Sequence, residues 1–244
     1  MNKISIKEIK DKYQYSSSDT IYARIVCRKF SVYFTWFFLY TSIIPNQLTV
    51  LMILLGITGG IFLGLDSYIS GLIGSLFLQL FLIFDCVDGE IARCKKIFSS
   101  KGKFLDFIAN DIIFVSIFSG LIFRIFNGNY EIFYFQLFHN PIVVILGFST
   151  IVFSTLFKLS SNYAKEIDDR MSGNFLKSSR SNIKIKPIIF QITGNLSSPP
   201  TIIIILTVCA IFDIFQYILF FYGTFSPLYY FTSLIIRLKS KEIK

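Results

Sequence analysis

The stretch FDCVDGEIARCKKIFSSKGKFLDFIANDIIF, residues 84–114, joins two apolar segments of the chain through a polar turn. The apolar segments cover residues 69–87 and 103–126, and each is long enough to cross a bilayer as a helix. Because the loop between them is short, they are predicted to form a hairpin whose polar ends lie side by side. This hairpin brings three aspartates, at positions 85, 88 and 106, to one edge of a membrane.

The composition of the chain is that of an integral membrane protein. Its 244 residues are 53% hydrophobic and 18% aromatic, and they include 29 Phe. A soluble domain of this length could not bury so much apolar surface. The polar start, residues 1–20, lacks the short apolar core of a signal peptide, so it is predicted to remain in the mature protein.

Six apolar runs are predicted to be transmembrane helices. A helix needs about 20 apolar residues to cross the hydrocarbon core, and fewer where its ends are buried in protein. The predicted spans are residues 48–65, 69–87, 103–126, 140–160, 200–222 and 225–238. A further apolar run, FSVYFTWFFLYTSII at 30–44, has fifteen residues and precedes Pro45-Asn46. It is either a seventh span or a helix that lies flat in the interface.

The distribution of Lys and Arg decides between these alternatives. If 30–44 lies flat and the N-terminus is cytoplasmic, the cytoplasmic segments hold 7, 5, 7 and 4 basic residues, which is 23 of the 24. Only Arg124 then lies on the far side. If 30–44 were a span, the N-terminal seven would face the opposite side from the other sixteen. The positive-inside rule therefore favours an amphipathic interfacial helix. The same loops account for the net charge of +9, and no nucleic acid is expected as a partner.

The predicted organisation is one membrane domain with an amphipathic arm. Residues 1–47 form the cytoplasmic N-terminus and the interfacial helix, residues 48–238 the six-helix domain, and residues 239–244 a cytoplasmic tail. Residues 161–186 form a polar, basic loop that is predicted to be mobile. The fold class is all-α and integral to an inner or cytoplasmic membrane, with both termini and the acidic cluster on the cytoplasmic side.

The three carboxylates predict a metal site. On a helix, Asp85 and Asp88 share a face, and Gly102, Asp106 and Asn110 share another. Carboxylates that converge at a membrane–water boundary repel one another and lose hydration, and a bound cation offsets this cost. Mg²⁺ and Mn²⁺ prefer oxygen ligands, and Mg²⁺ is often shared with substrate phosphates. The chemistry that this indicates is attack on a metal-held diphosphate or phosphate ester.

Small residues and one arginine beside the acids predict a phosphate pocket. Gly89, Ala92 and Gly102 leave room for a ligand to approach the backbone. Arg93 has the planar, forked guanidinium that binds phosphate. The structural alternative is a solvated turn whose acids are neutralised by neighbouring lysines, and an isolated Asp-x-x-Asp would favour it.

The acidic stretch resembles the signature of the CDP-alcohol phosphotransferases, D-x-x-D-G-x-x-A-R-x8-G-x3-D-x3-D. Seven of the eight fixed positions match with the family's spacing: Asp85, Asp88, Gly89, Ala92, Arg93, Gly102 and Asp106. The stretch PNQLT at 45–49 is similar to the one that opens the family's first span. The resemblance covers about residues 22–238.

The resemblance implies transfer of a phosphoalcohol group from a CDP-linked lipid or CDP-alcohol donor to an alcohol acceptor, with release of CMP, in phospholipid or polar-headgroup biosynthesis. The three motif aspartates would hold two Mg²⁺ or Mn²⁺ ions, and Gly89, Ala92, Arg93 and Gly102 would line the cytidine diphosphate pocket. A homodimer in contact with membrane lipid is also implied. Acceptor candidates are glycerol phosphate, inositol or its phosphate, serine and diacylglycerol, and Glu90 resembles members that make inositol phosphodiesters.

One motif position departs from the family. The last aspartate, taken to deprotonate the acceptor, falls on Asn110, and a neutral amide does not accept a proton near pH 7. Asp111 follows, but at about 100° per residue it points about 140° away from Asp106.

Three interpretations of this departure remain open. In the first, Asn110 offers its carbonyl oxygen to a metal, and the acceptor loses its proton to another group or late in the reaction. In the second, a π-bulge recruits Asp111. In the third, transfer is lost, and a catalytically impaired member binds a CDP-linked ligand or acts as a membrane partner protein.

Two other functions fit the sequence less well. Membrane prenyltransferases carry a pattern similar to N-D-x-x-D-x-x-x-D, and the nearest match, NDIIF at 110–114, has Phe where the next Asp should be. A transporter or assembly protein would use polar residues such as Asp213 and Gln216 within the predicted fifth span. A single intramembrane acid is, however, often a packing or hydrogen-bonding residue.

Overall fold

The computed structural model describes residues 4–14, 22–132, 135–137, 139–174 and 198–242. In chain order its elements are α1 (Ile6–Glu8), the π-helical turns η1 (Ile9–Tyr13) and η2 (Ala23–Cys27), α2 (Arg28–Leu39), α3 (Pro45–Gly64), α4 (Tyr68–Lys95), α5 (Ser100–Asn127), β1 (Glu131–Ile132), β2 (Phe135–Gln136), α6 (Pro141–Asn174), α8 (Pro199–Phe212) and α9 (Phe215–Glu242). The strands β1 and β2 pair antiparallel in the connection between α5 and α6. The other described elements are helical.

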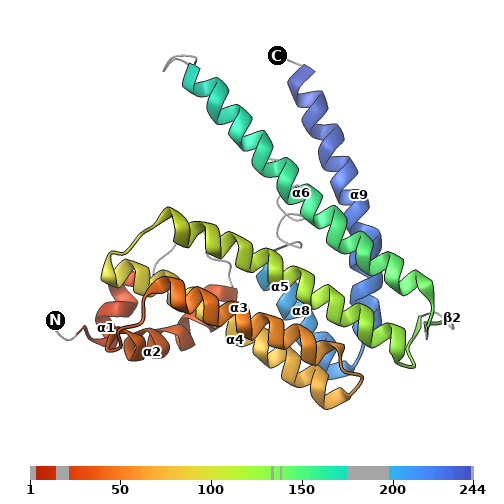
Figure 1. Ribbon diagram of the computed structural model, residues 1–244, viewed down its shortest axis with the longest axis horizontal. Coiled ribbons are helices and arrows are strands. Elements are labelled where there is room, and N and C mark those ends of the chain that lie inside the picture. The colour runs from red at the N-terminus through yellow and green to blue at the C-terminus, as the bar shows by residue number, and fades with distance from the viewer. Residues whose placement is uncertain (1–3, 15–21, 133–134, 138, 175–197, 243–244) are drawn as a thin grey trace.

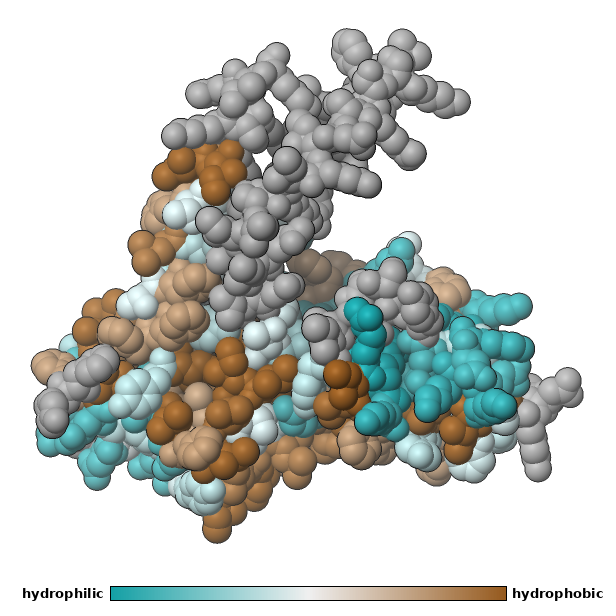
Figure 2. Space-filling view, turned by 180° about the vertical axis from the view of Figure 1, so that it is seen from behind, coloured by the Kyte–Doolittle hydropathy of each residue, from teal (hydrophilic) through white to brown (hydrophobic). Residues whose placement is uncertain are grey.

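Five helices of the described chain are long and apolar enough to cross a membrane. They are α3, α4, α5, residues Pro141–Tyr163 of α6, and residues Phe215–Ile236 of α9. A sixth apolar helix, α8, has only 14 residues. Hydrophobic side chains cover the middle of the molecule, and hydrophilic ones gather at the end that carries the N-terminal segment (Figure 2). The chain is therefore an all-α integral membrane protein, as predicted. Its described residues contain five long apolar helices and one short one, which does not confirm the predicted count of six spans.

The last two predicted spans divide the chain at the wrong place. The sequence predicts spans at 200–222 and 225–238, whereas the helices are separated at residues 213–214 and α9 continues through Pro227. Asp213 caps α8 in a left-handed conformation with φ 52°. Its Oδ1 accepts a 2.8 Å hydrogen bond from Nη2 of Arg124 in α5. The break thus accompanies a tertiary ion pair that a local hydrophobicity pattern does not reveal.

Helix α3 packs against both α4 and α5, and the three helices form one unit (Figure 1). Small residues let their backbones approach closely, as is common between membrane helices. A Cβ added at Gly60 of α3 would lie 2.7 Å from the backbone carbonyl of Ser116 in α5, and one added at Gly74 of α4 would lie 2.8 Å from the carbonyl oxygen of Gly59 in α3. This close packing holds the C-terminal end of α4 and the N-terminal end of α5 beside the start of α3.

Helices α6 and α9 form a second unit that leans away from the first (Figure 1). Aromatic rings line the contact between them, including Phe157 against Tyr229 at 4.6 Å between ring centroids. Helix α6 continues to Asn174, so the first part of the predicted 161–186 loop is helical. The remainder of that loop, from residue 175 on, lies outside the described residues.

The N-terminal segment lies across the end of α4 (Figure 1). A twelve-residue helix, α2, stands where the sequence predicts an amphipathic helix, and it is not among the helices long enough to span. Its polar residues Arg28, Ser31 and Thr35 are buried, whereas Phe30 and Tyr33 are exposed. The polar face of α2 therefore packs against the protein, and its aromatic face points outward.

Candidate active site

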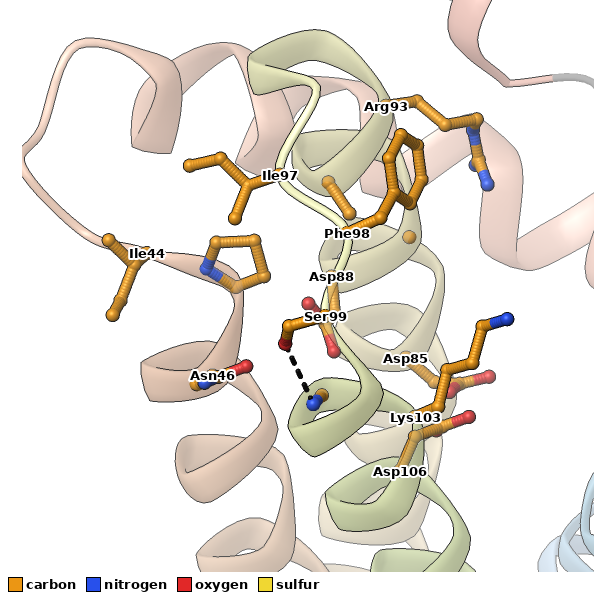
Figure 3. Close-up of a pocket in the computed structure, with 14 residues that line it drawn as sticks. Ile44, Asn46, Asp85, Asp88, Arg93, Ile97, Phe98, Ser99, Lys103 and Asp106 are labelled. Atoms are coloured by element: carbon orange, nitrogen blue, oxygen red, sulfur yellow. Dashed lines mark hydrogen bonds between the residues drawn. The ribbon is translucent and has the colours of Figure 1, made fainter.

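A cavity of about 400 Å³ opens where α4 ends and α5 begins, beside the first turn of α3. It is lined by all seven residues that match the family motif: Asp85, Asp88, Gly89, Ala92, Arg93, Gly102 and Asp106. The labelled side chains among them surround the space between these helices (Figure 3). The polar ends of the predicted hairpin thus meet in a single cavity.

The turn between α4 and α5 is built by local capping. Lys96 ends α4 in a left-handed conformation with φ 55°. Ser99 begins α5, where its Oγ accepts a 2.9 Å hydrogen bond from the backbone N–H of Gly102. A serine N-cap of this kind satisfies a donor that the helix leaves without a partner. The caps bring the last turns of α4 and the first turns of α5 to the same cavity.

The three aspartates divide into a pair and a separate member. Asp85 and Asp106 lie within hydrogen-bonding reach of each other, and their side chains lie next to each other in Figure 3. Asp88 instead accepts a 2.7 Å hydrogen bond at Oδ2 from Oγ1 of Thr49 in α3. The charge of Asp106 nevertheless acts on Asp88. The three carboxylates therefore share one electrostatic environment although they do not share one contact.

The carboxylate oxygens in this cavity are of the chemical type that binds a hard divalent cation. Carboxylate oxygens are ligands that Mg²⁺ and Mn²⁺ prefer, and substrate phosphates commonly complete such sites. Within the described ranges, however, no three Asp, Glu, His or Cys side chains are placed so that they could hold a metal by themselves. The chain presents two adjacent carboxylates and a third turned toward Thr49. A metal here would complete its shell with phosphate oxygens or with a reoriented Asp88.

The guanidinium of Arg93 lies close to the backbone of Gly89. A Cβ added at Gly89 would be 3.2 Å from Nη1 and 3.6 Å from Nη2 of Arg93. The Nε of Arg93 donates a 2.6 Å hydrogen bond to the carbonyl oxygen of Tyr13 in the N-terminal segment. Gly89 thus leaves space for an arginine whose other edge is bound by the N-terminal segment.

The predicted catalytic positions, Asn110 and Asp111, do not line the cavity. Nδ2 of Asn110 donates a 2.9 Å hydrogen bond to the backbone carbonyl of Asp106. Asp111 forms an ion pair with Lys158 of α6. Helix α5 is α-helical throughout Ser100–Asn127 and has no π-turn there. The bulge that would carry Asp111 to the cavity is therefore not present.

Two residues of the stretch PNQLT belong to the site, although the sequence analysis assigned no role to either of them. Asn46 lines the cavity, and a Cβ on Gly102 would lie 3.1 Å from its Oδ1. Thr49 is only 1% exposed and binds Asp88. The resemblance of this stretch to the family's first span was the signal that could have pointed to them.

Glu90 is fully buried and does not line the cavity. Its carboxylate accepts hydrogen bonds from side chains of the N-terminal segment, among them Nη1 of Arg28 at 2.8 Å. The similarity of Glu90 to the inositol-type members of the family therefore concerns a residue that faces the N-terminal segment.

Comparison with known proteins agrees with the motif. The family model for CDP-alcohol phosphatidyltransferases matches residues 42–222. The chain is also 39% identical over 75 residues to a "Bifunctional IPC transferase and DIPP synthase" of Aquifex aeolicus (strain VF5). That match covers 30% of this chain and 17% of the relative, so the chain aligns with a small part of the longer protein. Because the family model covers most of the chain, including the cavity, the protein belongs to the CDP-alcohol phosphatidyltransferase family.

Proposed function

We propose that the protein transfers a phosphoalcohol group from a CDP-linked lipid or CDP-alcohol to an alcohol acceptor, with release of CMP, in phospholipid or polar-headgroup biosynthesis. One observation carries the proposal: seven motif residues from two helices line one cavity. In the reaction, the acceptor oxygen forms a bond to the phosphorus of the phosphoalcohol group. The bond from that phosphorus to the oxygen of the CMP phosphate breaks, and the acceptor hydroxyl gives up its proton.

Two Mg²⁺ or Mn²⁺ ions are the proposed cofactors, since family members generally depend on a divalent metal. Asp85, Asp88 and Asp106 would hold them, and the ions would neutralise charge on the diphosphate. The proximity of Asp85 and Asp106 supports this assignment, because adjacent carboxylates are costly without a cation. Thr49 orients Asp88.

The cytidine diphosphate group is proposed to bind along α4 and the first turn of α5. Gly89, Ala92 and Gly102 present little side-chain bulk there. The Nη atoms of Arg93 lie beside Gly89, where they can donate to phosphate oxygens. These residues bind and orient the donor, which is the main protein contribution in phosphoryl transfer.

Deprotonation of the acceptor is proposed to occur without Asn110 as a base. Its amide is no proton acceptor at neutral pH, and Asp111 is paired with Lys158 away from the cavity. The acceptor would lose its proton to another group in the cavity or late in the reaction. The carbonyl oxygen of Asn110 could serve as an additional metal donor only if its side chain turned from the Asp106 carbonyl toward the cavity, which it does not line.

The cavity and both termini are proposed to face the cytoplasm. The support is the distribution of basic residues, of which 23 of 24 fall in segments assigned to that side. Membrane lipid is the proposed environment of the aromatic face of α2. A homodimer is proposed from family membership alone, and the mass of the protein in nanodiscs would test it.

The second candidate function is a catalytically impaired member that binds a CDP-linked ligand or serves as a membrane partner protein. Asn110 favours it, because the usual base is missing and Asp111 does not replace it at the cavity.

A turnover assay separates the two functions. The purified protein in nanodiscs is given Mn²⁺, a panel of CDP-linked lipids and CDP-alcohols, and the acceptors glycerol phosphate, inositol, inositol phosphate, serine and diacylglycerol. Release of CMP is measured, with Asp106→Asn as the inactive control. Transferase function predicts release by the wild type that the control abolishes. No release by the wild type, together with release after Asn110→Asp, would establish the impaired member instead.

A further inference from the structure

The carboxylate of Glu90 is a buried hydrogen-bonding centre outside the cavity. Its Oε1 accepts bonds from Nη1 of Arg28 at 2.8 Å and from Oγ of Ser31 at 2.6 Å. Nε2 of Gln14 approaches the same oxygen at 3.2 Å. Oε2 accepts a 2.5 Å bond from Oγ1 of Thr35. Both oxygens are therefore bound to the N-terminal segment, and neither is available to an acceptor alcohol.

All four donors come from the segment that carries the amphipathic helix. We call residues 4–14 and 22–39 together the arm. Within α2, Arg28, Ser31 and Thr35 lie on one face, at spacings of three and four residues. The opposite face carries exposed aromatic side chains. Glu90 is the buried polar anchor of the arm on α4. The contacts of Phe34 and Phe38 with Phe84 and the hydrogen bond from Tyr22 to Gln79 add to this attachment.

The arm reaches the cavity through two consecutive residues. The Gln14 side chain binds Glu90 and also donates a 2.7 Å bond to the backbone carbonyl of Arg28. The preceding residue, Tyr13, offers its carbonyl oxygen to Nε of Arg93 at 2.6 Å. Glu90 and Arg93 are one helical turn apart on α4, so the same two residues of the arm contact both. The position of the Tyr13 carbonyl therefore depends on the bonds of Gln14 to Glu90 and to the backbone of Arg28, whose side chain Glu90 also binds.

We propose that Glu90 is a positioning residue for the nucleotide site: by binding the arm, it places the Tyr13 carbonyl that orients the guanidinium of Arg93 beside Gly89. This inference rests on the proposed function for the identity of the ligand, but not for the attachment of the arm. A buried carboxylate with four donors is a stable anchor, since removing a partner from such a group leaves charge or donors unsatisfied. Orientation of Arg93 matters because the forked guanidinium binds phosphate through directed bonds.

The test uses four full-length proteins in the same nanodiscs: wild type, Glu90→Gln, Gln14→Met and Arg124→Lys. Gln14→Met keeps the buried ion pair, so it remains informative if Glu90→Gln folds poorly. Arg124→Lys is the control, because the buried Arg124 also forms a 2.8 Å ion pair, with the partly exposed Asp213, but outside the cavity. Two quantities are measured: hydrogen exchange of residues 4–14 and binding of CMP with Mn²⁺, per folded molecule.

Both arm variants are expected to speed exchange of residues 4–14 by about tenfold and to weaken CMP binding by about threefold to tenfold, the size of one or two lost hydrogen bonds. The Arg124→Lys control is expected to change neither quantity. In an Arg93→Ala background, Glu90→Gln should cost little further affinity, because the two residues act in series.

Unchanged exchange in both arm variants would overturn the inference. So would unchanged CMP affinity despite faster exchange, or full additivity with Arg93→Ala. A wild type that binds no CMP would contradict the proposed function, and the exchange data alone would then decide whether Glu90 anchors the arm.

Discussion

The hydroxyl of Thr49 in α3 donates a 2.7 Å hydrogen bond to Oδ2 of Asp88 in α4. Thr49 is buried, and the carbonyl oxygen of Pro45 lies 3.2 Å from its hydroxyl oxygen as the more distant acceptor for the same proton. The bond joins the first turn of one helix to the last turns of another, at the edge of the cavity. Partners of this kind orient metal-binding carboxylates, and their loss commonly weakens metal affinity by about 10- to 100-fold.

Replacing Thr49 with valine is therefore expected to weaken Mn²⁺ binding by about tenfold. Valine keeps the branched shape but removes the donor, so Asp88 loses its fixed orientation. The measurement is Mn²⁺ affinity in the presence of CMP, read from the electron paramagnetic resonance signal of free Mn²⁺. Thr58→Val is the control, because Thr58 lies on the same helix, is half-buried and donates its hydroxyl to the backbone carbonyl of Leu54. Equal effects of the two substitutions would contradict a role for Thr49.

Replacement by alanine is predicted to lower ligand affinity at one glycine and stability at another. In Gly89→Ala, the new methyl group meets the flexible end of Arg93 at 3.2 Å, so CMP affinity should fall by about threefold to tenfold with little loss of stability. In Gly60→Ala, the methyl group would lie 2.7 Å from the backbone of Ser116. The free energy of unfolding should therefore fall by about 1–3 kcal/mol.

Thermal unfolding and CMP titration of the two glycine variants give this comparison. A Gly89→Ala protein that unfolds as readily as Gly60→Ala but binds CMP normally would show that Gly89 serves packing and not the ligand.

The meeting of the polar ends of α4 and α5 at one cavity could be predicted because its signals are local, whereas the packing of both helices on α3 could not. The spacing of Asp85, Asp88 and Asp106 on two helices joined by a short loop determines which faces meet. The charge pattern likewise indicated that residues 30–44 form no span, and α2 is too short to be one. Periodicity and spacing therefore placed the main features of the site.

Features that depend on distant partners were not predictable. Asp213 looked like an acid inside a span, but it ends α8 and pairs with Arg124, 89 residues away in sequence. Glu90 stood out in the sequence through its similarity to members that make inositol phosphodiesters, but its hydrogen-bond partners lie 55 to 76 positions earlier in the chain. Hydropathy carries no information on such pairs, so the helix break and the anchor of the arm required the structure.

Arg124 is predicted to be a major source of stability at the end of the bundle opposite the cavity. Its buried guanidinium binds Asp213, the hydroxyl of Tyr130 at 2.6 Å and the backbone carbonyl of Leu65. Burial raises the pKa of Tyr130 to about 12, so this phenol stays neutral at physiological pH. Arg124→Met removes all these bonds and should lower the free energy of unfolding by about 3–5 kcal/mol.

Asp213→Asn is the matched comparison for Arg124→Met. The Asp213 side chain is 40% exposed, and Arg124 keeps its other acceptors, so the expected loss is about 1 kcal/mol or less. Thermal unfolding of both variants in the same detergent shows which substitution destabilises the protein more. A larger loss for Asp213→Asn would contradict the view that the arginine, and not the acid, is the centre of this cluster.

Trp36 is the single tryptophan of the chain and provides a direct measure of where α2 lies. It is 40% exposed on the outward face of the helix, with its ring edge-on to Tyr40 at 5.1 Å between centroids. Because aromatic side chains of interfacial helices sit near the boundary between headgroups and acyl chains, lipids brominated near the top of the acyl chain should quench its fluorescence more strongly than lipids brominated at the chain end. The double variant Trp36→Phe/Phe34→Trp moves the probe to the face that packs on Phe84, where quenching should be weaker. Strongest quenching by bromine at the chain end would place α2 across the bilayer, and the orientation derived from the basic residues would then be wrong.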